Sequence, residues 1–303
     1  MRGVLRMLGV IIAVTLVSSA AYAVSAPLVV DSAWLDRNSG KVVIVDVRDK
    51  DAYREGHIQN AINMPVNSLQ SKPDAILLPS RELEKILGGK GLDISKEVVL
   101  YGAGKEIASL EFWMLDYLGM QKVHVLDGGI EQWKGRLSTV ETKLPPAVFR
   151  ANPDPGKYAA TDYVGGALKK TGVVILDVRT PGEYKGTDVR SLRGGHIPGA
   201  INMNFEGNYL EGSTRLKSTD ELAKLYSGLD KNKEIIVYCQ TGTRATNTYL
   251  VLKELGFPRV RNYDASWVEW GSNLSLPADD VSYFNFMSLI GAVKKLEKGA
   301  QKQ

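Results

Sequence analysis

A short apolar run that ends in an acid and a base occurs twice in the chain, as Lys41-Val-Val-Ile-Val-Asp46-Val-Arg48 and as Val173-Val-Ile-Leu-Asp177-Val-Arg179. In each case a tyrosine, a Gly-His-Ile triplet and an Ala-Ile-Asn-Met quartet follow in the same order. Further along, residues 91–133 align on residues 228–270 without a gap. The sequence therefore predicts two copies of one domain.

Both copies alternate β-branched apolar runs with helical patterns, which is typical of a parallel sheet flanked by helices. Buried strands are predicted at 42–45, 98–101, 173–176 and 235–238. Helices are predicted over 106–118 and 243–255, because Gly119 and Gly256 follow them where a left-handed residue ends a helix. We expect an α/β fold of two tandem domains, residues 28–143 and 157–276. Prolines at 145, 146, 153 and 155 predict a linker over 144–156.

The composition is that of an ordinary globular chain: 303 residues, 38 Lys+Arg against 34 Asp+Glu, three His and one Cys. One cysteine excludes an intramolecular disulfide and any zinc site that needs two thiolates, and we expect no metal or other cofactor. Six of the basic residues lie in the first 23 or the last ten positions, which leaves 32 against 34 acidic ones. We therefore expect no nucleic-acid partner.

The two ends of the chain have patterns of their own. Arg2 and Arg6 precede an apolar stretch over 7–17 and an Ala21-Tyr-Ala23 motif, which predicts a signal peptide over 1–23 with the cut after Ala23. That stretch is shorter than the roughly 20 residues of a membrane-spanning helix. We expect a periplasmic or secreted protein with no integral membrane span after signal removal. Residues 277–303 form an amphipathic, basic tail, which fits a packed helix or a membrane-surface or partner helix.

The single cysteine follows the predicted strand 235–238, in the stretch Cys239-Gln-Thr-Gly-Thr-Arg244. Open parallel sheets bind ligands at the carboxyl ends of their strands. Gly242 permits a turn that aims backbone N–H groups at the sulfur, and the helix that follows adds the positive end of its dipole. These fields favour the nucleophilic thiolate. Arg244 offers a planar donor pair to an anionic substrate group.

The other copy shows that the fold does not require this thiol, because its aligned residue is Gly102. A buried structural cysteine is the alternative interpretation. An unpaired thiol in an oxidising compartment favours chemistry instead. We predict that Cys239 is catalytic and that residues Gln240, Thr241, Gly242, Thr243 and Arg244 bind substrate.

The duplicated motifs, the Cys239 loop and the stretch Tyr263-Asp-Ala-Ser-Trp267-Val-Glu-Trp270 resemble those of the tandem rhodaneses, the thiosulfate and mercaptopyruvate sulfurtransferases, of an exported bacterial type. The resemblance covers nearly all of residues 30–272. It implies a catalytically silent first domain and an active second one. It also implies that a persulfide on Cys239 carries sulfane sulfur from thiosulfate or a polysulfide to cyanide, a thiol or a protein acceptor.

Departures from the family pattern bear on the substrate. Similar eukaryotic members carry Arg where Glu183 stands and Lys or Ser where Thr241 stands, so thiosulfate or polysulfide is favoured over mercaptopyruvate. Related phosphatases and arsenate reductases place one more residue between Cys and Arg than the four found here, which makes that activity the lesser alternative. The other alternative is a persulfide carrier that is not an enzyme.

Several residues that recur in both copies are predicted to be structural. His57 and His196 are found with and without the cysteine, and the strand-end pairs are expected to tie strands to loops. His124 is predicted to be exposed. Trp267 and Trp270 are predicted to pack between the domains.

Overall fold

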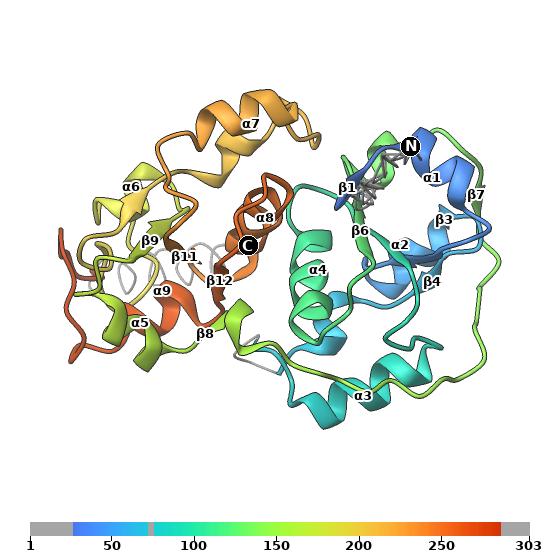
Figure 1. The fold of residues 1–303 in the computed structure, drawn as a ribbon, viewed down its shortest axis with the longest axis horizontal. Coiled ribbons are helices and arrows are strands. Elements are labelled where there is room, and N and C mark those ends of the chain that lie inside the picture. The colour runs from blue at the N-terminus through green and yellow to red at the C-terminus, as the bar shows by residue number, and fades with distance from the viewer. Residues whose placement is uncertain (1–26, 72–75, 286–303) are drawn as a thin grey trace, which may run out of the picture.

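The computed structural model describes residues 27–71 and 76–285 as two α/β halves that lie side by side (Figure 1). The predicted signal peptide and all but the first nine residues of the predicted C-terminal tail lie outside the described residues. Among the described residues, no helix has both the length and the apolar character needed to cross a bilayer.

The first half contains a five-stranded sheet in the order β1-β6-β5-β2-β4, in which every neighbouring pair is parallel. Its strands are β1 (Val29–Val30), β2 (Val43–Asp46), β4 (Ile62–Asn63), β5 (Val98–Tyr101) and β6 (Val123–Leu126). A separate antiparallel pair joins β3 (His57–Ile58) to β7 (Leu137–Ser138).

The second half repeats this sheet in the order β8-β12-β11-β9-β10, again with parallel neighbours. Its strands are β8 (Tyr158–Ala159), β9 (Val173–Asp177), β10 (Ile201–Asn202), β11 (Glu234–Tyr238) and β12 (Val260–Tyr263). The predicted strands are therefore confirmed to within one residue at each end.

Helices cover these sheets. The α-helices are α1 (Ser32–Asn38), α2 (Lys50–Glu55), α3 (Ser80–Gly89), α4 (Ile107–Tyr117), α5 (Thr161–Ala167), α6 (Pro181–Tyr184), α7 (Thr219–Leu225), α8 (Thr243–Glu254) and α9 (Ser266–Trp270). The 3-10 turns are η1 (Val66–Leu69), η2 (Gly129–Gln132), η3 (Pro155–Lys157) and η4 (Phe205–Asn208). Both long helices match their predictions and are followed by left-handed glycines, Gly119 with φ +98° and Gly256 with φ +77°. In the predicted linker, residues 144–154 are neither helix nor strand.

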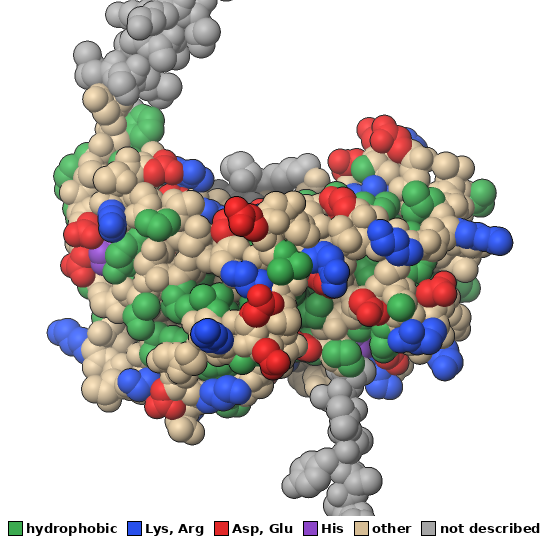
Figure 2. All heavy atoms as spheres, turned by 90° about the horizontal axis from the view of Figure 1, so that it is seen from above, with side chains coloured by type: hydrophobic (Ala, Val, Ile, Leu, Met, Phe, Trp, Pro, Cys, Tyr) green, Lys and Arg blue, Asp and Glu red, His purple; other side chains and the backbone are tan. Residues whose placement is uncertain are grey.

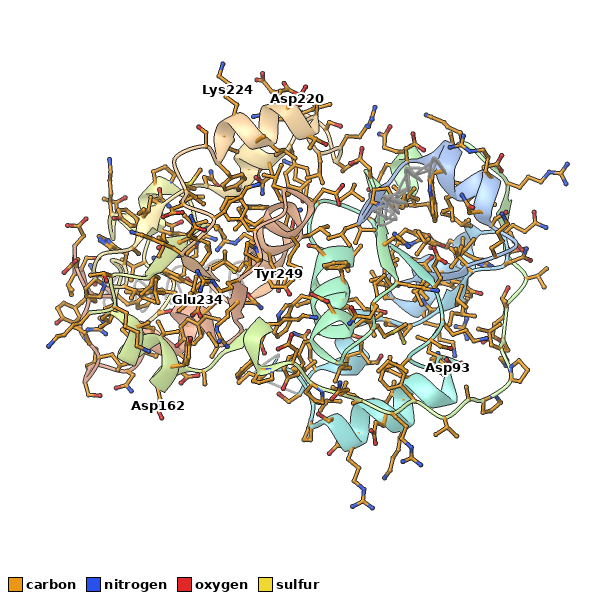
Figure 3. All side chains as sticks on the ribbon, viewed as in Figure 1. Asp93, Asp162, Asp220, Lys224, Glu234 and Tyr249 are labelled. Carbon is orange, nitrogen blue, oxygen red and sulfur yellow. The ribbon has the colours of Figure 1, made fainter. Side chains whose placement is uncertain are left out.

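The halves meet where α4 packs against α8 (Figure 1). One apolar cluster contains buried residues of both halves, so the core continues across this interface. Tyr249, labelled between the halves in Figure 3, donates from α8 to Asp116 Oδ2 on α4 at 2.6 Å. Lys157 Nζ pairs with the other oxygen of Asp116 at 2.6 Å. A partly buried polar network of this kind helps to fix the orientation of the two helices.

Two predictions about aromatic residues are wrong. Trp267 and Trp270 pack inside the second half, in a cluster with residues of β8, α5 and β12, because their indole N–H groups donate to the backbone of that half. His124 is buried, since its ring contacts Trp34 and its nitrogens lie 2.7 Å from Pro27 O and 3.2 Å from Glu97 Oε1. The chain before β1 covers this histidine, and periodicity within β6 does not reveal that cover.

Candidate active site

Cys239 is the first residue after the central strand β11, and no part of it is exposed. Its backbone is held from two sides. Its N–H donates to Ser266 Oγ at 3.1 Å, and its carbonyl accepts from Trp267 N at 3.0 Å. Ser266 has a positive φ of 50°, which is uncommon for a residue with a side chain. The start of α9 therefore anchors the base of the Cys239 loop, a role that the sequence analysis did not give to Ser266.

The loop turns at Gly242, which has φ +85° and immediately precedes α8. A Cβ atom at this position would lie 2.5 Å from the carbonyl oxygen of Asp264, so only glycine fits. Within the described residues, the backbone N–H groups of residues 240–244 donate to no protein acceptor. Unpaired N–H groups at the start of a 12-residue helix form a favourable environment for an anion.

The corresponding loop of the first half is arranged differently. Gly102 stands at the position of Cys239, and its carbonyl accepts from Ile130 N at 3.0 Å, just as Cys239 accepts from Trp267. The backbone N–H of Gly104, in this loop, donates a hydrogen bond of 2.9 Å to the carboxylate of Glu131. Val268 stands at the position of Glu131 in the second half. The first half thus lacks the thiol and fills part of its loop with its own anion, whereas no described residue of the protein accepts from the loop N–H groups of the second half.

Arg244 does not point its guanidinium at open solvent. It makes two parallel hydrogen bonds of 2.8 Å to Glu183, whose side chain is fully buried. Burial raises the pKa of Glu183, but the hydrogen bonds and charge of Arg244 outweigh it and bring that pKa to about 2. Glu183 also closes a capping box with Thr180 at the start of α6. The predicted anion-binding side chain is therefore occupied by a carboxylate of the same half.

Electrostatics couple this pair to the thiol. Burial lowers the pKa of Arg244, but the hydrogen bonds to Glu183 and the negative charges of Cys239 and Glu183 outweigh burial and raise this pKa above its ordinary value. Arg244 is therefore charged at any physiological pH.

The Cys239 loop is also contacted by a segment that only the second half contains. Twelve positions separate Tyr184 from His196, whereas four separate Tyr53 from His57. The extra residues bring Arg190 and Ser191 to the Cys239 loop, where Gln240 Nε2 donates to Arg190 O at 3.1 Å and to Ser191 Oγ at 2.9 Å. The sequence analysis missed both residues. The insertion itself was the only signal for them.

The structure places all six predicted site residues on one turn. Cys239 and Gly242 are buried, Thr241 is exposed, and the other three are partly buried. Beneath the turn, the predicted strand-end pairs are confirmed: Asp177 pairs with Arg179 as Asp46 does with Arg48, and a tyrosine hydroxyl donates to each aspartate at 2.6 Å.

The two repeated histidines have the same surroundings in both halves, as expected for a structural role. His57 stacks on Tyr53 with ring centroids 3.8 Å apart, and His196 stacks on Tyr184 at 3.7 Å. In each ring, Nδ1 lies within 2.9 Å of the carbonyl oxygen of the stacked tyrosine. Because both halves contain the same arrangement, it does not depend on the thiol.

Comparisons with known proteins agree with this architecture. A family model described as a rhodanese-like domain matches residues 30–136 and 160–273. A protein from Azotobacter vinelandii named thiosulfate sulfurtransferase is 34% identical over 268 residues, which cover 84% of this chain and 98% of that protein. A putative thiosulfate sulfurtransferase from Mycobacterium tuberculosis (strain H37Rv) is 36% identical over 272 residues, or 83% of this chain and 97% of that one.

A solved structure shares the fold across both halves. SseA from Escherichia coli, described as a 3-mercaptopyruvate sulfotransferase, superposes with a TM-score of 0.71 at 28% identity and covers 80% of this chain and 99% of its own. Two family matches, relatives aligned over most of their length and the duplicated sheet order all agree. This chain belongs to the rhodanese family and carries two rhodanese-like domains in tandem.

Proposed function

We propose that this chain is a sulfurtransferase in which Cys239 carries the transferred sulfur as a persulfide. The contrast between the two loops supports this function most strongly. The second half has a thiol beside unpaired backbone N–H groups, whereas the first half has a glycine and a carboxylate. The names of the relatives from Azotobacter vinelandii and Mycobacterium tuberculosis support thiosulfate as the donor.

In the first step, the Cys239 thiolate attacks the outer sulfur of thiosulfate. A new S–S bond forms at Cys239, the S–S bond of the donor breaks, and sulfite leaves with the bonding electron pair. The three negative charges of the reactants are conserved as sulfite and a terminal persulfide anion. Backbone N–H groups of the loop stabilise that anion, as an oxyanion hole stabilises a developing alkoxide.

In the second step, cyanide or a thiolate attacks the outer sulfur of the persulfide. The S–S bond at Cys239 breaks and returns its electron pair to the Cys239 sulfur, which regenerates the thiolate. With cyanide the product is thiocyanate. Neither step needs an oxidant, a reductant or a metal, because a sulfur atom at the sulfane level passes unchanged from donor to acceptor.

The Arg244–Glu183 pair favours thiosulfate or polysulfide over a donor that carries a carboxylate. The carboxylate of such a sulfur donor would bind the two guanidinium N–H groups of Arg244, but these already donate to Glu183. Since Cys239 has no exposed surface, side chains around the loop have to move before any donor reaches the sulfur. A compact donor requires less movement than a larger one.

The purified chain should form thiocyanate from thiosulfate and cyanide, and the Cys239→Ser variant should form none. Thiocyanate production by the serine variant would remove Cys239 from the mechanism. A persulfide that forms on Cys239 without turnover of small acceptors would support the carrier function instead. We further propose, from the leader pattern of residues 1–23, that the protein is exported to the periplasm or secreted.

A further inference from the structure

The two halves hold each other through a matched pair of aspartates. Asp127 follows β6 and Asp264 follows β12, at aligned positions of the repeat. Each accepts a backbone N–H from the opposite half: Leu216 N donates to Asp127 Oδ1 at 2.8 Å, and Leu77 N donates to Asp264 Oδ2 at 3.2 Å. The interface therefore has approximate twofold symmetry at these contacts.

The symmetry fails at the second carboxylate oxygen. Asp127 Oδ2 accepts from Arg215 Nε at 3.0 Å, so both its oxygens have partners. The residue that precedes Leu77 is Ile76, and Asp264 Oδ1 has no hydrogen-bond partner among the described residues. Asp264 is 2% exposed. Burying a polar oxygen without a hydrogen-bond partner costs free energy, so the presence of Asp264 at this position needs a physical explanation.

The free oxygen lies against the catalytic turn. Asp264 Oδ1 is 3.0 Å, and the Asp264 carbonyl oxygen 2.5 Å, from the position that a Cβ on Gly242 would occupy. Both atoms therefore touch the one residue of the Cys239 loop that has a left-handed backbone. In the loop of the first half, the left-handed glycine is Gly104, which aligns with Thr241 rather than with Gly242. Among the described residues, no atom beyond its chain neighbours comes within 4 Å of a Cβ built on Gly104.

We propose that Asp264 is a positioning residue through which the first half holds the Gly242 turn, and with it the unpaired backbone N–H groups of the Cys239 loop. The proposal rests on the sulfurtransferase function given above and adds a role for the domain that lacks the thiol. Leu77 N fixes one carboxylate oxygen, so the aspartate stays pressed against the turn. Without that contact the turn gains freedom, and its N–H groups are no longer held in place to bind an anion beside Cys239.

The surroundings of Asp264 agree with a packing role rather than an ion pair. Burial raises the pKa of Asp264 to about 6, and the Leu77 N–H lowers it only in part. By contrast, the aligned Asp127 has the guanidinium of Arg215 beside it. Among the described residues, the catalytic half thus keeps a carboxyl group at this place without an ion-pair partner that would draw it away from the turn.

The test compares Asp264→Ala with the matched variant Asp127→Ala, which removes the same kind of interdomain hydrogen bond at the silent loop. Two quantities are measured on the full chain: kcat and KM for thiosulfate with cyanide, and the rate at which iodoacetamide alkylates Cys239. Because the chain has one cysteine, alkylation reports on Cys239 alone. Thermal unfolding followed by circular dichroism verifies that each variant is folded, and Asp264→Ser replaces the alanine variant if that one is not.

We expect Asp264→Ala to lower both kcat and the alkylation rate at least tenfold, and Asp264→Asn, which keeps the size and an acceptor oxygen, to restore most of the loss. Asp127→Ala should leave both rates within about twofold of the wild type. Equal losses in the two alanine variants, or no loss in either, would overturn the proposal. Alkylation does not require a sulfur donor, so it tests the role of Asp264 separately from the proposed function. If the proposed function is wrong, the wild-type chain will still be alkylated at Cys239 but will make no thiocyanate.

Discussion

Replacing Glu183 with glutamine tests whether the charge on this residue both stabilises the fold and restrains donor binding. Glutamine keeps the shape and still serves in a capping box, so the change removes mainly the negative charge. The pKa of Glu183 in the folded chain is about 2, against an ordinary value of 4.5. That difference corresponds to about 3 kcal/mol. Little screening is expected, since Glu183 is fully buried and Arg244 is 15% exposed.

The sign of the pH dependence follows from the lowered pKa. The stabilisation is present in full above the unfolded-state pKa of about 4.5 and is lost as the pH falls toward 2. Urea unfolding should therefore show Glu183→Gln to be less stable by about 3 kcal/mol at pH 7, with a difference that shrinks between pH 4.5 and pH 3. The matched control is Glu206→Gln, because Glu206 pairs with Lys105 but is 47% exposed. It should lose less than about 1 kcal/mol.

The same variant should bind thiosulfate more tightly. Two unit charges about 6 Å apart repel by roughly 3 kcal/mol at an effective dielectric constant of about 20. Removing the Glu183 charge, and freeing the Arg244 guanidinium, should thus lower the KM for thiosulfate at least tenfold in steady-state assays. A variant with wild-type stability at pH 7 would refute the ion-pair reasoning. An unchanged or higher KM would refute the claim that Glu183 competes with the donor.

Three further predictions concern the turn and the interface. Gly242→Ala should lower kcat at least tenfold and destabilise the fold by about 1–3 kcal/mol in urea unfolding, because its Cβ would lie 2.5 Å from a backbone oxygen. Gly104→Ala has open space around its Cβ at φ +80° and should leave kcat unchanged. Equal losses of kcat in the two variants would contradict this reasoning. Tyr249→Phe should lower stability by about 1–3 kcal/mol, since it removes the 2.6 Å bond to the Asp116 carboxylate, and an unchanged melting temperature in calorimetry would count against the network. The raised pKa of Asp264 means that its contribution to stability is greatest below pH 3.8 and falls as the pH rises through about 6. The stability of Asp264→Asn relative to the wild type should therefore rise by up to about 3 kcal/mol between pH 4 and pH 7.5. Urea denaturation of both proteins at these two pH values measures the difference, and an unchanged difference would contradict the prediction.

Features that depend on local pattern were predictable from the sequence. β-branched runs, left-handed glycines after helices and the duplicated motifs gave the strands, both long helices and the tandem architecture. Cys239 could be placed at a strand end because residues 235–238 of β11 form a continuous apolar run that ends immediately before it. The surface is as mixed as the balanced composition suggests, with acidic and basic side chains interspersed on the face shown in Figure 2.

Features that depend on distant contacts were not predictable. Glu183 and Arg244 lie 61 positions apart, and neither strand alternation nor helical spacing relates them. The contact of Gln240 with Ser191 depends on how the inserted segment folds back onto the loop. The burial of Trp267 within its own half, like that of His124, is set by segments that cover it, and a single repeat does not specify which segments those are.

Mass spectrometry of the chain after exposure to thiosulfate tests the central role of Cys239 most directly. One added sulfur atom should appear on the peptide that contains Cys239, and brief treatment with cyanide should remove it with release of one equivalent of thiocyanate. The account would be contradicted if the wild-type chain gained no sulfur, or if the Cys239→Ser variant gained and released it equally well.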